Sequence, residues 1–222
     1  MSPRIFQLVL SLSLGAIILG GCGIDSPVDP PRIDPPPSIP YTPDRLMQDF
    51  ETIYSDMLIN EFEEILHPAY RTILLQATMD EWSSSDDPLT ESYFNRDDEI
   101  RIHRNIFSGN TSGVSAAGVT IPPVSAIRVD LLEKADSTWE PIEDSDPDFA
   151  DHGGYRATYN VLLYFINPDN HQYEIDQVME FYVAPIDEGG KEKWLLLGIR
   201  GQEKAMLGTA RGTFCGLKSL YR

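Results

Sequence analysis

The amino-acid sequence predicts a single α+β domain with its helices first and an antiparallel sheet second. In the first half of the chain, apolar residues recur at spacings of three and four, as they do on one face of a helix. In the second half they alternate with polar residues, as in strands with one buried face. About 180 of the 222 residues follow a proline-rich stretch, which suits one domain with a sizeable core. We expect the order helix, helix, strand, helix and then four strands.

Two helices are predicted at the start of the domain. Thr42 is a suitable N-cap residue, and Pro43 suits the first helical position. One apolar stripe follows at spacings of four, three and four, made of Leu46, Phe50, Ile53 and Met57. Asn60 and Glu63 resemble a capping box, which predicts a second, short helix that ends at Pro68.

The next segments mix strand, loop and helix patterns. Residues 70–77 favour a strand, and the polar residues 80–92 around Trp82 favour a loop. Asn95 and Asp98 again have capping-box spacing and predict a third helix. One side of that helix would carry Ile100, His103 and Phe107.

Strands are predicted over residues 124–133, 155–166, 171–184 and 194–200. The second and third are joined by Asn-Pro-Asp-Asn at 167–170, which predicts a long antiparallel hairpin. Asp-Glu-Gly-Gly at 187–190 forms the next turn. Residues 214–221 fit either a closing strand or a short helix.

The N-terminal sequence carries a targeting pattern. Arg4 precedes an apolar run of 15 residues (5–19), which is shorter than the roughly 20 residues that span a membrane. Leu19-Gly20-Gly21-Cys22 follows and resembles a bacterial lipobox. The resemblance implies that residues 1–21 are removed, that Cys22 is acylated and that the protein is held in the cell envelope. An ordinary secretory signal is the alternative. Gly23, in place of Asp, favours the outer over the inner membrane.

Residues 22–41 form the lipidated cysteine and a tether, and residues 42–222 form the domain. Seven prolines between Gly23 and Thr42 favour an extended spacer that could reach roughly 60 Å. The whole chain has a net charge of −18, which becomes −19 when Arg4 leaves with the signal. A surface this acidic repels nucleic acid, so we exclude nucleic acid as a partner. It also repels anionic headgroups, so we expect the protein to contact the membrane through its lipid.

Two segments of the domain are similar to a known superfamily. Leu66-His67-Pro68-Ala69-Tyr70 resembles its passage from the second helix to the first strand, and residues 93–100 resemble the entry to its third helix. With the element order, they make the chain resemble the cone-shaped fold of nuclear transport factor two, ketosteroid isomerase and SnoaL-type cyclases, and within it uncharacterised bacterial lipoproteins. The resemblance implies a strongly curved sheet wrapped around helices, with a pocket open at one end. It implies no single activity.

Four residues are candidates for lining such a pocket: His67, His103, Trp82 and Tyr93. His67 would lie at a helix end, as an acid–base group or as a cap beside Pro68. His103 would be a pocket residue or a hydrogen-bonded core histidine. Trp82 and Tyr93 would be packing residues or lips of the pocket. The two histidines could share a metal ion, but no third or fourth ligand follows from the spacing, so we expect none.

Carboxylates elsewhere do not form a catalytic set. Alternation places Asp176 and Glu180 on the face of their strand opposite Tyr173, Ile175 and Val183, so we expect them to face water. Residues 144–151 carry alternate carboxylates that would suit calcium. Phe149 stands where a calcium loop needs glycine and Tyr155 where it needs glutamate, which favours a solvated acidic loop. The acidic residues around 80–91 invite the same interpretation.

Cys215 is the second of two cysteines, so an acylated Cys22 would leave it without a disulfide partner. It is expected to be a small buried residue, with a reactive thiol as the alternative.

The sequence thus favours a non-enzymatic, lipid-anchored module that binds a small ligand or an envelope protein, without a cofactor. One alternative is an isomerase, cyclase or hydratase that acts in the pocket. The other is a structural protein that oligomerises through its sheet, for example as a homodimer.

Overall fold

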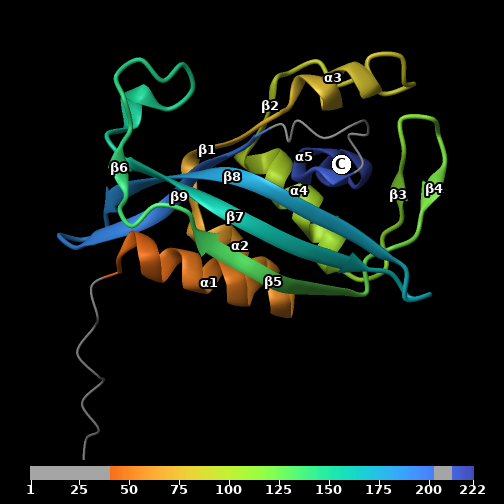
Figure 1. Ribbon diagram of the computed structural model, residues 1–222, viewed down its shortest axis with the longest axis horizontal. Coiled ribbons are helices and arrows are strands. Elements are labelled where there is room, and N and C mark those ends of the chain that lie inside the picture. Colours follow the sequence, from red (N-terminus) through yellow and green to blue (C-terminus); the bar gives the residue numbers. More distant parts are fainter. Residues whose placement is uncertain (1–40, 203–211) are drawn as a thin grey trace, which may run out of the picture. The chain divides into compact units, whose positions relative to one another are not determined.

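A mixed sheet forms the centre of the domain in the computed structural model, which describes residues 41–202 and 212–222 (Figure 1). Its strands run in the order β2-β1-β9-β8-β7-β5, with β6 beside β7. Their bounds are β1 Leu66–Ile73, β2 Tyr93–Asn95, β5 Ala126–Lys134, β6 Glu140–Pro141, β7 Tyr155–Ile166, β8 Gln172–Asp187 and β9 Glu192–Gly201. All neighbours are antiparallel except β1 and β9, which are parallel. The α+β class is confirmed, although the sheet is not purely antiparallel.

The long hairpin is confirmed. β7 and β8 pair from Tyr155 opposite Val183 to Ile166 opposite Gln172. Asn170 closes the turn with a φ of 62°, in the left-handed region that asparagine tolerates. The Asn167 side chain accepts the backbone N–H groups of Asp169 and His171, at 3.1 and 2.8 Å.

The helices are α1 Pro43–Asp56, α2 Ile59–Ile65, α3 Gln76–Trp82, α4 Arg96–Phe107 and α5 Phe214–Leu220. The Thr42 side chain caps α1 by accepting the backbone N–H of Arg45 at 3.2 Å. The capping box of α4 is present in both directions between Asn95 and Asp98. Of the two structures predicted for residues 214–221, the structure has the short helix, α5.

The second helix differs from the prediction at both ends. It begins after Leu58, which makes no side-chain cap, and it ends at Ile65, so His67 and Pro68 belong to β1. Proline disfavours a helical conformation for the residue before it, which extends the chain at His67. Pairing of Leu66 with Leu196 of β9 then starts the strand.

The segment after β1 also differs. β1 ends at Ile73, and α3 occupies part of the predicted strand and part of the predicted loop. Thr78 and Trp82 are buried at helical spacing, and Trp82 is 5% exposed. Thr78 is polar and Trp82 stands four residues later, so these two buried positions do not form a clear apolar stripe in the sequence. A further small sheet pairs β3 (Gly113–Val114) with β4 (Thr120–Ile121).

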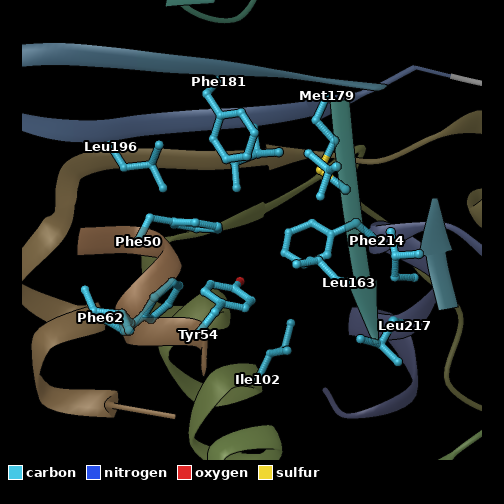
Figure 2. Packing of buried hydrophobic residues seen from close by; sticks show 14 of the residues in the cluster. Phe50, Tyr54, Phe62, Ile102, Leu163, Met179, Phe181, Leu196, Phe214 and Leu217 are labelled. Carbon is cyan, nitrogen blue, oxygen red and sulfur yellow. The ribbon is translucent and has the colours of Figure 1, made fainter. Parts of the chain in front are cut away.

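Apolar side chains of α1, α2, α4 and α5 form one core with the inward side chains of β7, β8 and β9. Tyr54 lies at its centre, with Phe50, Phe62, Phe107 and Phe214 around it at ring-centroid distances of 4.3 to 6.0 Å. Figure 2 shows Phe50, Tyr54, Phe62 and Phe214 among these rings, in one cluster with Leu163, Met179, Phe181 and Leu217. The interior that the cone resemblance leaves open is filled with side chains here.

The other face of the sheet carries a smaller cluster of Phe149, Tyr182, Ala184 and Leu197. Its strand residues alternate with Phe181, Val183 and Leu196 of the main core, so they point to the opposite side. Phe149 comes from the loop before the 3₁₀-helix η1 (Ala150–His152), which thus covers part of the outer face.

The predicted signal (1–21), the predicted lipidation site Cys22 and residues 23–40 of the predicted tether lie outside the described residues. Among the described helices, none has the length and apolar character that crossing a membrane requires.

Candidate functional site

His67 lies outside the core, on β1. The backbone N–H of Ala69 donates to its Nδ1 at 3.1 Å, and its ring meets that of His152 of η1 at 5.7 Å between centroids. Partial burial and the neighbouring His152 lower the pKa of His67. The predicted place at a helix end is wrong, because the helix ends two residues earlier.

His103 lies deep in the core, where Phe62 stacks on its ring at 3.9 Å. Its Nδ1 is 2.9 Å from the carbonyl oxygen of Glu99 and 3.1 Å from Oε2 of the same residue. Both neighbours are acceptors, which assigns the proton to Nδ1. Nε2 then accepts a hydrogen bond from the Tyr54 hydroxyl at 2.5 Å. Burial lowers the pKa of His103, which keeps the ring neutral.

Glu99, four residues before His103, is held by an ion pair. Lys218 of α5 places Nζ 2.8 Å from Glu99 Oε1 and 2.9 Å from the Thr72 hydroxyl, which itself donates to Oε1. The Tyr70 hydroxyl lies 2.9 Å from that of Thr72. We call this set the buried polar cluster: Tyr54, Tyr70, Thr72, Glu99, His103 and Lys218.

Charge in the cluster is balanced within it. Burial by itself would raise the pKa of Glu99, but the Lys218 ammonium and the His103 ring lower it to about 2. Burial raises the pKa of Tyr54 and of Tyr70 well above the ordinary value, and the Glu99 charge adds to it. The cluster therefore holds one carboxylate, one ammonium and neutral hydroxyl and imidazole groups.

The relay from Tyr54 through His103 to Glu99 has the connectivity of a general-base system. Each member is nevertheless fully buried, and its partners are other members of the cluster. Neither His103 nor Glu99 lines either of the two surface hollows that follow. In this arrangement the members of the relay bind one another inside the core.

The larger hollow is a cleft of about 1060 Å³ beside β1. β2 pairs only with residues 71–73 of β1, and the cleft continues along residues 66–70. Tyr93 lines it, with the Arg71 guanidinium 4.9 Å from the ring centroid. Its walls carry both signs of charge, from Glu63, Glu64 and Asp97 and from Arg71, Arg96 and Lys193. We call it the β1 cleft.

A second hollow of about 530 Å³ lies between the loop after α3 and the β3–β4 hairpin. Trp82 lines it, and the Arg222 guanidinium covers the Trp82 ring at 4.3 Å. The four candidate pocket residues therefore occupy four places: His67 the outer face, His103 the core, Trp82 this hollow and Tyr93 the β1 cleft. The structure does not bring them together.

The sequence predicted a solvated acidic loop at 144–151, and this prediction is wrong for Asp146, Asp148 and Phe149, which dock on the sheet, while Asp144 and Asp151 are exposed. The Asp146 side chain is 7% exposed and lies 3.2 Å from the Arg200 guanidinium, which also binds Asp148 at 2.8 Å. Asp146 further accepts the backbone N–H groups of Asp148 and Phe149. Arg200, side-chain hydrogen bonds and burial of Phe149 hold the loop against the sheet.

Glu180 belongs to the same network, whereas Asp176 is exposed. Glu180 lies 3.5 Å from Arg200 and accepts from the Tyr182 hydroxyl at 3.1 Å. Tyr182 is fully buried although it lies on the face expected to meet water, because the docked loop covers it. Within the described residues, no three His, Cys, Asp or Glu side chains converge as a metal site.

Sequence reasoning missed Glu99, Thr72 and Lys218. A usable signal exists for Glu99, which stands four residues before His103 on a helix whose apolar face was recognised. Lys218 stands between Leu217 and Leu220 in an otherwise apolar segment, a pattern that also describes a lysine reaching solvent.

Cys215 is buried, its thiol contacts the Ile73 carbonyl at 3.3 Å, and burial raises its pKa to about 11.

No protein-family model and no curated protein matches the chain. Solved structures with a similar arrangement include an NTF2-like protein of unknown function in nutrient uptake from Rhodospirillum rubrum. It is 8% identical, with a TM-score of 0.41, over 70% of this chain and 93% of that one.

Two others are a putative aromatic ring hydroxylase from Novosphingobium aromaticivorans and an uncharacterised cystatin-like protein from Caulobacter vibrioides. The first is 10% identical, with a TM-score of 0.45, over 78% of this chain and 92% of its own. The second is 13% identical, with a TM-score of 0.38, over 71% and 84%. The α+β assignment itself rests on the elements and the sheet described above.

Proposed function

We propose that the protein is a lipid-anchored, non-enzymatic module of the bacterial cell envelope that binds a polypeptide partner through the β1 cleft. The lipobox and the proline-rich tether support the anchor. One observation supports binding without catalysis most directly: the acid–base groups of the interior bind one another and are fully buried. The largest hollow described lies instead at the surface.

The character of the β1 cleft favours a polypeptide over a small molecule. Sites for small ligands enclose most of the ligand within roughly 300–1,000 Å³ of mainly apolar lining. The β1 cleft is wide and open, with apolar strand residues such as Leu66 and Leu195 between charged walls. An extended segment with apolar and charged side chains of both signs would fit such a lining. A small-ligand module, an enzyme and a self-associating structural protein are the alternatives.

Site-specific photocrosslinking tests the proposal. A photoreactive residue at Asn95, in the β1 cleft, is compared in the source cell with one at Asp169, in the turn after β7. We expect a discrete protein adduct from position 95 and none from position 169. Because capture alone is weak support, Lys193→Glu in the cleft should remove the adduct. Lys191→Glu, the same change two residues away and outside the cleft lining, should leave it.

The proposal is wrong if position 95 yields no protein adduct, or if Lys191→Glu and Lys193→Glu weaken it equally. An adduct that contains only this chain would favour the self-associating alternative. Far-UV circular dichroism of each variant checks that the fold is intact.

A further inference from the structure

The ammonium of Lys218 is surrounded by groups that recognise a primary ammonium ion. Its Nζ lies 2.8 Å from the Glu99 carboxylate, 2.9 Å from the Thr72 hydroxyl and 4.0 Å from the centroid of the Phe214 ring. The Glu99 carboxylate and the Thr72 hydroxyl accept N–H donors of the ammonium, and the Phe214 ring, which lies on α5 with Lys218, covers it.

The two acceptors and the cation come from three different elements. Thr72 lies on β1 within the sheet, and Glu99 lies in the first turns of α4; both are fully buried. Lys218 is carried by α5, a helix of seven residues that lies outside the sheet. Glu99 Oε2 faces His103 Nδ1 at 3.1 Å, but the N–H of that nitrogen bonds the Glu99 carbonyl at 2.9 Å. Oε1 of the carboxylate therefore makes its contacts with Lys218 and Thr72.

A buried ion pair is a weak way to stabilise a helix in a core. Desolvation of the two charges offsets most of their attraction, and an apolar pair of similar volume is often at least as stable. A helix as short as α5 is unstable alone and is held by its tertiary contacts. Among these, the Phe214 backbone N–H donates to Gln177 at 3.1 Å, and Asn105 donates to the Tyr221 carbonyl at 2.8 Å. Such an element can open locally while the sheet stays folded.

We propose that Glu99 and Thr72 form a primary-ammonium site inside the domain and that Lys218 fills it as an internal occupant. A ligand with a primary ammonium on a short apolar body replaces Lys218 there, and α5 withdraws. The apolar body follows from Phe62, Ile102 and the other core side chains around the cluster (Figure 2). Glu99, Thr72 and Lys218 do not line the β1 cleft, although Tyr70, which contacts Thr72, does, and the proposal does not rest on the function proposed above.

Thiol labelling can detect this exchange, because Cys215 lies on α5 and is buried. The full chain with Cys22→Ser, in mild detergent, has Cys215 as its one thiol. We expect n-butylammonium to raise the labelling rate of Cys215 saturably, by about tenfold or more. Butyltrimethylammonium, which has no N–H donor, and n-butanol, which has no charge, should have no such effect. Glu99→Gln should abolish the response.

A second variant covers the case in which Glu99→Gln does not fold. Lys218→Ala removes the occupant and leaves the carboxylate, so n-butylammonium should raise its thermal midpoint, or restore folding, saturably. Butyltrimethylammonium should not. The proposal requires both results: unchanged Cys215 labelling in the Lys218 protein, or no selective rescue of Lys218→Ala, overturns it.

Discussion

At the residue scale, Arg200 is the side chain that joins the outer face of the sheet to the acidic loop. Its guanidinium contacts the carboxylates of Asp146, Asp148 and Glu180 and lies 2.6 Å from the Tyr182 hydroxyl. Partial burial by itself would lower the pKa of Arg200, but the carboxylates offset this effect and raise the pKa above its ordinary value. Arg200 thus makes the ion pairs of Asp146 and Asp148, while the Arg71 guanidinium donates to the Asp148 carbonyl at 3.5 Å.

Removing the Arg200 cation should destabilise the protein. Arg200→Met leaves the nearly buried Asp146 carboxylate without its ion pair, so we expect a loss of about 2 kcal/mol in the free energy of unfolding. Arg45→Met is the matched control, because Arg45 makes an exposed pair with Asp49 and should contribute less than about 0.5 kcal/mol. Urea unfolding measures both. Equal effects would contradict the role given to Arg200.

Acidification should destabilise the folded state through the buried His103, the partly buried His67 and the buried Glu99. Burial lowers the pKa of His103 and of His67 below 6.5, so the unfolded chain binds these protons first as the pH falls. Stability is therefore lost as the pH falls below about 6.5. It is lost further between about 4.5 and about 2, where Glu99 titrates.

The measurement is the urea midpoint between about pH 7.5 and 5, in about 0.5 M salt to screen repulsion among the acidic groups. His67→Asn should reduce the slope by removing one of the titrating groups. A midpoint that is constant or rises on acidification would show that the histidines are not held neutral.

At the element scale, α5 completes the core. Its Phe214, Cys215 and Leu217 side chains pack among residues of α1, α4 and β8, so the helix occupies space that a cone would leave open. The β3–β4 hairpin is the opposite case, because its Val114 and Val119 side chains are 49% and 59% exposed.

Phe214→Ala should destabilise the protein by about 3–5 kcal/mol, because it removes a fully buried ring beside Tyr54. Val119→Ala should change stability by less than about 0.5 kcal/mol. Thermal unfolding compares the two. A loss below about 1 kcal/mol for Phe214→Ala would show that α5 adds little to the core, and would also weaken the idea that it shields a site.

At the scale of the whole molecule, the proposal is an acidic domain held at a distance from a membrane by a lipid and a spacer. Its net negative charge gives it no electrostatic attraction to anionic headgroups, so the acyl chains would supply the membrane affinity. The tether would let the β1 cleft meet partners away from the membrane surface.

Cys22→Ser tests the anchor. We expect the wild-type protein to incorporate labelled palmitate and to sediment with membranes, and the variant to lose both. Cys215→Ser, which changes a buried thiol, is the control and should retain both. Palmitate incorporation that persists in Cys22→Ser would refute lipidation at Cys22.

The sequence by itself determined the elements whose signals are local. The caps at Thr42 and Asn95, the helical stripe of α1 and the alternation in β7 and β8 each depend on residues a few positions apart. The end of α2 and the existence of α3 needed more. Pairing of Leu66 with Leu196 and burial of Trp82 decided them against the local pattern.

Only the tertiary structure decided which candidate residues meet. Thr72, Glu99 and Lys218 lie on a strand, a middle helix and the last described helix, and no local pattern relates three positions so far apart. The same holds for the docking of the acidic loop by Arg200 and the scattering of His67, His103, Trp82 and Tyr93 over four places. The spacing of apolar residues predicts which side of a helix or strand is buried. It does not record which other element covers that side, because folding brings distant segments together through contacts that neither segment encodes alone.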